Sequence, residues 1–235
     1  MSRPSIDSET ILIPDSLQET LYRLEEARRG FRPQSPETVQ QALQWILSRQ
    51  GLKGSYRNLF APTEKDLSTG LELITGEKYP KRKALVRHIL GEEALRATVL
   101  WNLKSSPAVS KALEGFRDIL ESGEKPPKET GFYCCYTCTM PFLRTLSVVK
   151  PEGWGETLER GIDNIKKART ADGRWRRFPF YYTLLTFSEL DTPSAETELR
   201  HAGRTCEKLL NRYQNKGDRA SLFKRLALEA AIKAL

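Results

Sequence analysis

The feature that most constrains the fold is the recurrence of helix-start signals, each followed by apolar residues at helical spacing. Ser35-Pro36-Glu37 places an N-cap serine before a proline at the first helical position, and Ser106-Pro107 repeats that signal. Residues 39–47 then show the i, i+3, i+4 apolar pattern of one buried helix face. No stretch alternates apolar and polar residues long enough to predict a strand. The pattern predicts ten or eleven helices and an all-α protein.

The chain of 235 residues is long enough to bury one sizeable core. No low-complexity segment or long linker divides it. The most loop-like stretch, residues 121–130, contains two prolines and a glycine, and its length suits a connection between helices as well as a hinge. We therefore expect a single helical domain over residues 1–235, with a candidate hinge near residues 121–130.

A short glycine and aromatic pattern recurs after predicted helices. It reads Thr170-Ala-Asp-Gly-Arg-Trp175 in the second half of the chain, and Gln50, Gly54 and Tyr56 form a degenerate earlier copy. This pattern resembles the Q-x-x-D-G-x-W repeat of the terpenoid cyclase and protein prenyltransferase superfamily, although Arg169 stands where the family has glutamine. The resemblance implies antiparallel helix pairs arranged in a partial or compact α/α toroid. A generic helical array with aromatic turns is the alternative.

The catalytic motifs of that superfamily are absent from the sequence, which has no Asp-x-Asp-Asp, no Asp-Asp-x-x-Asp and no Asp-x-Cys. The leading hypothesis is therefore a non-catalytic binding or scaffold protein. The resemblance implies an apolar ligand, isoprenoid-like or lipid-like, or a protein partner, and a chain this short suggests a homodimer as one arrangement. The candidate ligand-binding residues are aromatic: Tyr56, Phe60, Tyr133, Trp175, Phe180 and Tyr181.

An enzyme related to terpenoid cyclases or prenyltransferases is a second hypothesis. His88 and Glu92 lie four residues apart, so an unbroken helix places both on one face, where they can share a proton. Tyr133 completes the candidate catalytic set. The plainer interpretation of His88 and Glu92 is a junction between two helices at Gly91, with acidic residues in the first turn of the second helix.

The cysteines allow a metal site. Cys135 and Cys138 have C-x-x-C spacing, and His201 with Cys206 would complete a tetrahedral zinc site. Only one C-x-x-C is present and it lies in an apolar segment, so packing of small core residues is the favoured interpretation. The sequence identifies no cofactor.

Nucleic-acid binding is the third hypothesis, because the chain carries a formal charge of +8. A basic turn interleaved with aromatic residues suits phosphate contacts and base stacking. A second basic series, Arg204, Lys208, Arg212 and Lys216, recurs every four residues. Charged stripes are usually solvated faces, which is the plainer interpretation. The candidate nucleic-acid-binding residues of the turn are Lys166, Lys167, Arg174, Arg176 and Arg177.

We expect no transmembrane segment, because no apolar run approaches the roughly 18–20 residues that a membrane helix needs. The N-terminal stretch MSRPSIDSETILIPDS has no apolar core, so a secretory signal is not predicted. Three of the four cysteines lie within five residues, which does not resemble a disulfide framework. These features predict a cytoplasmic protein.

Overall fold

The structure is a computed structural model that describes residues 10–79 and 81–235; residues 1–9 of the stretch considered for a signal lie outside this range. Its secondary structure is helical, with isolated bridges and no longer strand in the described residues, which confirms the all-α prediction. None of the described helices is both long and apolar enough to span a bilayer. The helices are α1 (Leu17–Arg28), α2 (Pro36–Ser48), α3 (Glu64–Thr69), α4 (Lys83–Leu100), α5 (Pro107–Glu121), α6 (Pro127–Thr130), α7 (Tyr136–Val149), α8 (Trp154–Lys166), α9 (Phe180–Phe187), α10 (Pro193–Leu210) and α11 (Arg219–Lys233).

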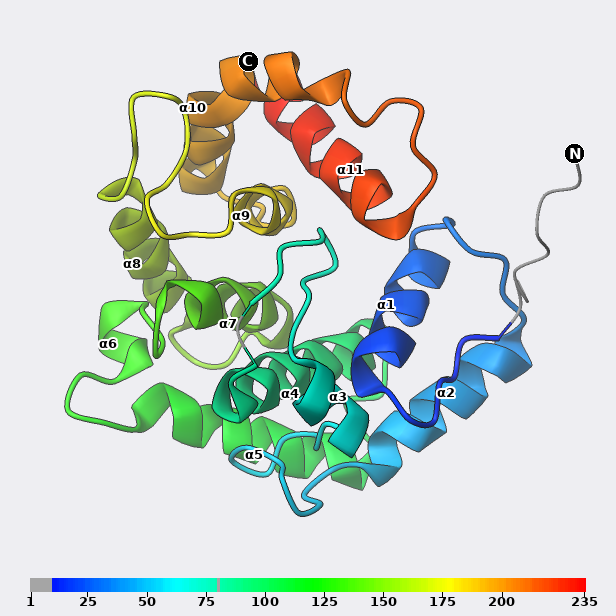
Figure 1. The fold of residues 1–235 in the computed structure, drawn as a ribbon. Coiled ribbons are helices and arrows are strands. Elements are labelled where there is room, and N and C mark those ends of the chain that lie inside the picture. The colour runs from blue at the N-terminus through cyan, green and yellow to red at the C-terminus, as the bar shows by residue number, and fades with distance from the viewer. Residues whose placement is uncertain (1–9, 80) are drawn as a thin grey trace, which may run out of the picture. The chain divides into compact units, whose positions relative to one another are not determined.

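The described chain divides into two compact units. Their helices are labelled in Figure 1. The N-terminal unit comprises residues 10–70 and 81–116, and the C-terminal unit comprises residues 71–79 and 117–235. The division falls inside α5, between Phe116 and Arg117, and not in the loop at residues 121–130.

The helix starts of the N-terminal unit follow the cap signals of the sequence. Ser35 caps α2 through a reciprocal capping box with Thr38, and Pro36 occupies the first helical position. Ser16 is the N-cap of α1 and accepts a hydrogen bond from the Glu19 amide. Asp15, just before it, forms an ion pair with Lys65 at 2.9 Å.

Two helices were expected on either side of Gly91, but α4 runs unbroken from Lys83 to Leu100, so the predicted junction is wrong. Gly91 serves close packing instead of a break. A Cβ atom at this position would lie 3.0 Å from the Cβ of Leu59, a tight contact, so the absence of a side chain helps the loop before α3 to approach the helix closely. The helix α3 ends at Thr69, where Gly70 adopts a positive φ of 88°.

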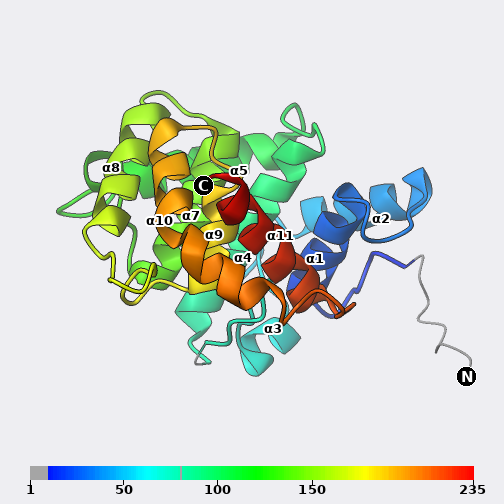
Figure 2. The ribbon, with the colours of Figure 1, turned by 90° about the horizontal axis from the view of Figure 1, so that it is seen from above.

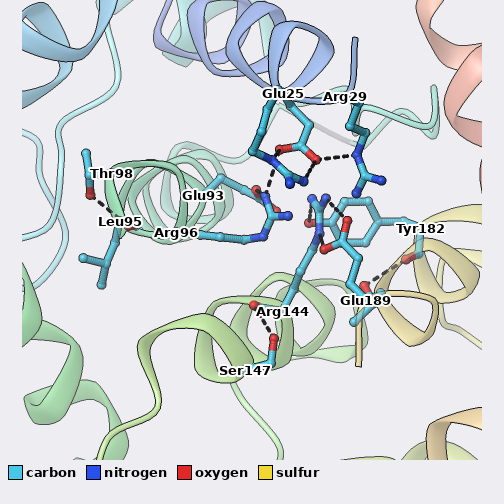
Figure 3. A network of polar contacts seen from close by, with 12 residues as sticks. Glu25, Arg29, Glu93, Leu95, Arg96, Thr98, Arg144, Ser147, Tyr182 and Glu189 are labelled. Atoms are coloured by element: carbon cyan, nitrogen blue, oxygen red, sulfur yellow. Dashed lines mark hydrogen bonds and ion pairs between the residues drawn. The ribbon is translucent and has the colours of Figure 1, made fainter. Parts of the chain in front are cut away.

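Charged side chains join α1 to α4 within the N-terminal unit. Arg96 of α4 is buried, and its Nη1 lies 3.4 Å from Glu25 Oε2 and 3.5 Å from Glu93 Oε2. Glu25 also accepts a 2.6 Å hydrogen bond from Arg29, as Figure 3 shows. Buried charges are tolerated only when they are paired, so this cluster specifies how α1 packs on α4.

The short helix α9 is the centre of the C-terminal unit. It packs against α7, α10 and α11, and Figures 1 and 2 show it enclosed by these helices. Seven of its eight residues are buried, and Tyr181 is the one that is half-exposed. Such a helix is apolar on all sides, as its sequence FYYTLLTF shows.

A buried ion pair fixes α7 beside α9. Arg144 of α7 is 1% exposed and forms two 2.7 Å hydrogen bonds with the carboxylate of Glu189, just after α9 (Figure 3). The guanidinium also lies over the ring of Tyr182, 5.4 Å from its centroid. This two-point pairing satisfies most of the guanidinium in the interior.

Gly131 and Gly161 allow α6 and α8 to approach closely. Gly131 ends α6 with φ of 65°, and a Cβ atom there would lie 2.1 Å from the amide nitrogen of Gly161 and 2.6 Å from the carbonyl oxygen of Thr157. Both neighbours belong to the backbone of α8 and cannot move aside. Gly203 in α10 differs, because the atoms nearest to a Cβ atom there, from 2.5 Å, all belong to the side chain of Leu235.

We therefore expect Gly131→Ala and Gly203→Ala to have opposite effects on the free energy of unfolding, measured by urea denaturation. Gly131→Ala should destabilise the protein by about 3 kcal/mol, through the left-handed backbone and the clash. Gly203→Ala should be neutral or stabilise by up to about 1 kcal/mol, because alanine favours a helix interior and the exposed Leu235 side chain can rotate. Equal effects of the two substitutions would contradict this account of the packing.

Candidate functional site

The positive charge of the C-terminal unit is concentrated in two segments. Residues 166–177 contain six Lys or Arg and one acidic residue, and residues 204–225 contain seven Lys or Arg and two acidic residues. The rest of the unit holds nine basic and fifteen acidic residues. The two segments meet in the fold, since the Thr205 hydroxyl donates a 2.6 Å hydrogen bond to the carbonyl oxygen of Asp172. The unit therefore has a strongly basic region on an otherwise acidic body.

The basic turn after α8 is a tightly closed loop. Arg169 and Trp175 pair as an isolated antiparallel bridge, and the Arg176 amide donates to the carbonyl oxygen of Ala168 at 2.8 Å. Gly173 has φ of 75°, and a Cβ atom there would lie 3.1 Å from the carbonyl oxygen of His201. The turn is thus held against α10.

The earlier copy of the pattern closes in a similar way in the N-terminal unit. Gln50 and Phe60 form an antiparallel bridge, and the Ala61 amide donates to the carbonyl oxygen of Arg49 at 3.0 Å. The aromatic residue that pairs with the helix end is Phe60, which is fully buried, whereas Tyr56 lies within the longer loop.

A buried carboxylate anchors Trp175. Glu198 of α10 is 1% exposed and receives hydrogen bonds from Trp175 Nε1 at 2.8 Å and from Arg169 at 2.7 and 3.0 Å. The indole ring packs 5.4 Å from Phe187 and 6.1 Å from Phe180, measured between centroids. Trp175 and Phe180 are therefore core residues, and they hold the basic turn in place.

Cations and aromatic rings alternate where the two basic segments meet. Lys224 Nζ lies 5.0 Å from the ring centroid of Tyr181 and 5.3 Å from that of Tyr213, and the two tyrosine hydroxyls are 2.9 Å apart. Burial and the neighbouring Tyr213 raise the pKa of Tyr181, so its hydroxyl stays neutral at physiological pH. We call this set the basic aromatic surface; its residues are Arg174, Tyr181, Tyr213, Lys216 and Lys224.

Every member of the basic aromatic surface keeps some exposure. Lys216 is exposed and lies over the ring of Tyr213 at 5.5 Å, while the other four members are half-buried. Arg174 stacks over Phe180 at 4.6 Å and forms an ion pair with Asp172 at 3.3 Å. Contacts of this kind order long cationic side chains while leaving their charge available to an anion.

Glu77 fixes the position of Tyr181. Its carboxylate, on the loop formed by residues 71–79, accepts hydrogen bonds from the amides of Tyr181 at 2.8 Å and Tyr182 at 3.2 Å, and from the Thr75 hydroxyl. It thus caps α9 from a position more than one hundred residues earlier in the chain. Burial raises the pKa of Glu77, and the hydrogen bonds counter this only in part.

The other predicted cations of the turn lie at its exposed edge. Lys166, Lys167, Arg176 and Arg177 are all exposed. Arg177 also lies over the ring of Tyr136, 5.5 Å from its centroid. The five candidate nucleic-acid-binding residues therefore share one turn, four of them exposed and Arg174 half-buried.

Sequence reasoning missed Tyr213 and Lys224, and it treated Lys216 as part of a helix face. α10 ends at Leu210, so Lys216 lies in the loop that follows. Tyr213 is 32 residues from Tyr181, and no local pattern indicates that their hydroxyls meet. Only the folding of α10 and α11 around α9 brings them together.

The candidate catalytic residues belong to different units. His88 and Glu92 lie on α4 of the N-terminal unit, and Tyr133 lies in the C-terminal unit. The ring of His88 packs on Tyr56 at 4.0 Å between centroids, and burial lowers the pKa of His88 to about 4, so it is neutral at pH 7. Glu92 is fully buried, and its pKa is raised by burial and by the charge of Glu93. The catalytic hypothesis stays a prediction.

The four candidate zinc ligands are all in the C-terminal unit, but they are not gathered as a ligand set. Cys135 is the N-cap of α7 and Cys138 is buried in its first turn, whereas His201 and Cys206 lie on α10. Within the described part of this unit, no three metal-ligating side chains bring their ligand atoms within 4.8 Å of one another. Burial raises the pKa of Cys206 to about 12, as expected for a packing thiol.

The N-terminal unit contains an apolar groove of about 620 Å³. It runs along α2 and faces the segment that follows α4. Volumes of this size are typical of small-molecule sites. The residues that line it are Gln34, Pro36, Val39, Gln40, Leu43, Gln44, Trp101 and Leu103.

No known protein-family model matches the chain, and no curated protein is significantly similar to it in sequence.

Substitutions of Glu77 test how α9 and Tyr181 are held. We expect Glu77→Ala to lower the free energy of unfolding by about 1–3 kcal/mol, because two buried backbone amides lose their acceptor. Glu77→Gln should retain most of the stability, since an amide oxygen can accept the same bonds. Urea denaturation followed by circular dichroism measures both.

The pH dependence adds a second test of Glu77. A pKa raised in the folded state stabilises the protein below the unfolded pKa, and that contribution is lost as the pH rises through the folded value. The stability advantage of the wild type over Glu77→Gln should therefore shrink between pH 4 and pH 7. An advantage that grows over this range would mean that the carboxylate is favoured in its charged form.

Proposed function

We propose that the C-terminal unit binds single-stranded nucleic acid through the basic aromatic surface and the exposed cations of the basic turn. The observation that carries the proposal is the alternation of cations and tyrosine rings at Arg174, Tyr181, Tyr213, Lys216 and Lys224. No reaction is part of the proposal, in keeping with the absence of the superfamily's catalytic motifs from the sequence.

Charge supports the proposal first. Neutralising phosphates and releasing their counterions supplies most of the affinity of nonspecific nucleic-acid binding. The two basic segments hold thirteen Lys or Arg against three acidic residues, and the Thr205 contact with Asp172 keeps them adjacent. Since the rest of the unit is acidic, a polyanion has one favourable region of approach on this unit.

The aromatic rings favour a single strand over a duplex. Bases that are unpaired can stack on tyrosine side chains, and such stacking tolerates any sequence. Tyr181 and Tyr213 are half-exposed beside Lys216 and Lys224, so one surface offers aromatic side chains next to cations that can contact phosphates. The buried carboxylate of Glu77 and the Tyr181–Tyr213 hydrogen bond fix these rings before any ligand arrives.

Charge reversal at Lys216 tests the proposal. We expect Lys216→Glu to weaken binding of a fluorescein-labelled 20-nucleotide oligo(dT) or oligo(U) roughly tenfold at low salt, measured by fluorescence anisotropy. The wild type should show a linear loss of log affinity with log salt, and the variant a slope smaller by about one unit.

The matched control is Lys233→Glu, which makes the same charge change at an exposed site near the other end of α11. It should leave the affinity within about twofold of the wild type. Binding that is absent or insensitive to salt in the wild type, or equally weak in both variants, would overturn the proposal.

A second candidate function rests on the apolar groove of the N-terminal unit. The hypothesis favoured by the sequence was an apolar ligand, and this groove has the volume and the aliphatic and indole lining that a small apolar molecule requires. Its polar lining consists of glutamine side chains, which orient a ligand without adding charge. Association of the chain as a homodimer and the toroid arrangement of its helices stay predictions.

Leu103→Gln tests the groove with Nile red as an uncharged apolar probe. We expect the dissociation constant of the dye to rise about fivefold, because part of a leucine side chain is lost from the lining. Leu52→Gln, at a 47% exposed leucine of the same unit outside the groove, should not change it. A dye that binds both variants as tightly as the wild type would show that the groove is not its site.

A further inference from the structure

Two cysteines at the start of α7 lie close together. The Sγ atoms of Cys134 and Cys138 are within 4.8 Å of each other. The C-x-x-C spacing in the sequence would pair Cys138 with Cys135 and not with Cys134. We propose that Cys134 and Cys138 are a redox-responsive thiol pair that closes to a disulfide when the protein meets a low-molecular-weight disulfide such as oxidised glutathione.

The two thiols differ in access in the way that a two-step exchange requires. Cys134 is exposed, so its sulfur can attack a disulfide from solution. Cys138 is fully buried and can be reached only from within the protein. The exposed thiol is therefore the attacking group, and the buried thiol resolves the mixed disulfide.

The backbone holds the attacking cysteine in an unusual conformation. Cys134 has φ of 55°, a left-handed value that is uncommon for a residue with a side chain, and the Cys135 amide donates to the carbonyl oxygen of Tyr133 at 2.6 Å. This three-residue turn directs Cys134 away from the path of the helix. Conformations of this kind persist only where the surrounding structure enforces them.

The Thr139 hydroxyl holds the backbone on both sides of Cys134 by hydrogen bonds. This hydroxyl bonds the amide of Tyr133 at 3.0 Å and the carbonyl oxygens of Tyr133 and Cys135 at 3.1 and 2.9 Å. Thr139 follows Cys138 directly, so these bonds tie the segment before α7 to the helical turn that carries Cys138. The two sulfurs are thus positioned by the backbone, and rotation about the Cα–Cβ bonds is the motion left for closure to the roughly 2 Å of an S–S bond.

The resolving cysteine lies at the N-terminal end of a helix. Cys138 lies in the first turn of a 14-residue helix, where the helix dipole is positive, and that turn contains no acidic residue.

The exchange balances without a metal or cofactor. The Cys134 thiolate attacks oxidised glutathione, forming a mixed disulfide and releasing one glutathione thiolate. The Cys138 thiolate then attacks Cys134 Sγ and releases the second. The cysteine pair loses two electrons and two protons, and the glutathione disulfide is reduced to two thiols. Because the closed loop is short, the bond adds little stability and stays easily reducible.

The test is a thiol count on the full chain after incubation with oxidised glutathione. Remaining thiols are labelled with a maleimide in denaturant and counted by mass spectrometry. We expect the wild type to fall from four reactive thiols to two, and dithiothreitol to restore four. A wild type that keeps four thiols at every glutathione ratio, or that loses them only by forming disulfide-linked dimers, would overturn the proposal.

Single substitutions identify the pair, because Cys134, Cys135 and Cys138 fall in one tryptic peptide, residues 129–144. Cys135→Ser should still close the disulfide and keep one thiol, that of Cys206. Cys134→Ser should form no intramolecular disulfide, and Cys138→Ser should accumulate glutathione on Cys134. Since Cys134 is exposed, Cys134→Ser is expected to fold as the wild type does, which circular dichroism checks. A disulfide that survives in Cys134→Ser and is lost in Cys135→Ser would assign the pair to Cys135 and Cys138 instead.

Discussion

The structure of the C-terminal unit depends on polar partners for the ends of one buried helix, α9. A helix that is apolar on all sides gains stability by burial, but its terminal amides and carbonyls need partners when water is excluded. Glu77 accepts the first amides of α9, and Glu189, just past its end, pairs with Arg144 of α7. Glu77 and Arg144 come from parts of the chain distant from α9, so the loop formed by residues 71–79 and α7 both supply polar partners to the ends of this helix.

The rigidity of the basic aromatic surface depends on these contacts at the ends of α9. Tyr181 is the half-exposed residue of α9, and its backbone amide donates a hydrogen bond to Glu77. The ring is further fixed by the hydroxyl of Tyr213 and by Lys224. A surface residue therefore rests on a buried carboxylate, which links the stability of the core to the geometry of the proposed binding surface.

Local signals in the sequence predicted the helices well, because caps and apolar spacing act within a few residues. Ser35 and Pro36 begin α2, and Ser106 directly precedes α5. The failures arose where glycine had a tertiary role: Gly91 was interpreted as a break, and it permits contact with Leu59. The candidate site was predicted only in part, because Glu77 and Lys224 approach Tyr181 through long-range packing that no local pattern encodes.

In the glycine and aromatic pattern, the residues that hold the turn differ from those that can contact a ligand. Arg169 and Trp175 are both bonded to the carboxylate of Glu198, and Gly173 provides the close approach to α10, so the residues that define the pattern are committed to holding the turn. Arg174, at a position that the pattern leaves unspecified, is half-buried, and Arg176, which follows the pattern, is exposed. A repeat of this kind is therefore informative about how helices are joined, and the variable positions beside it decide what the surface can bind.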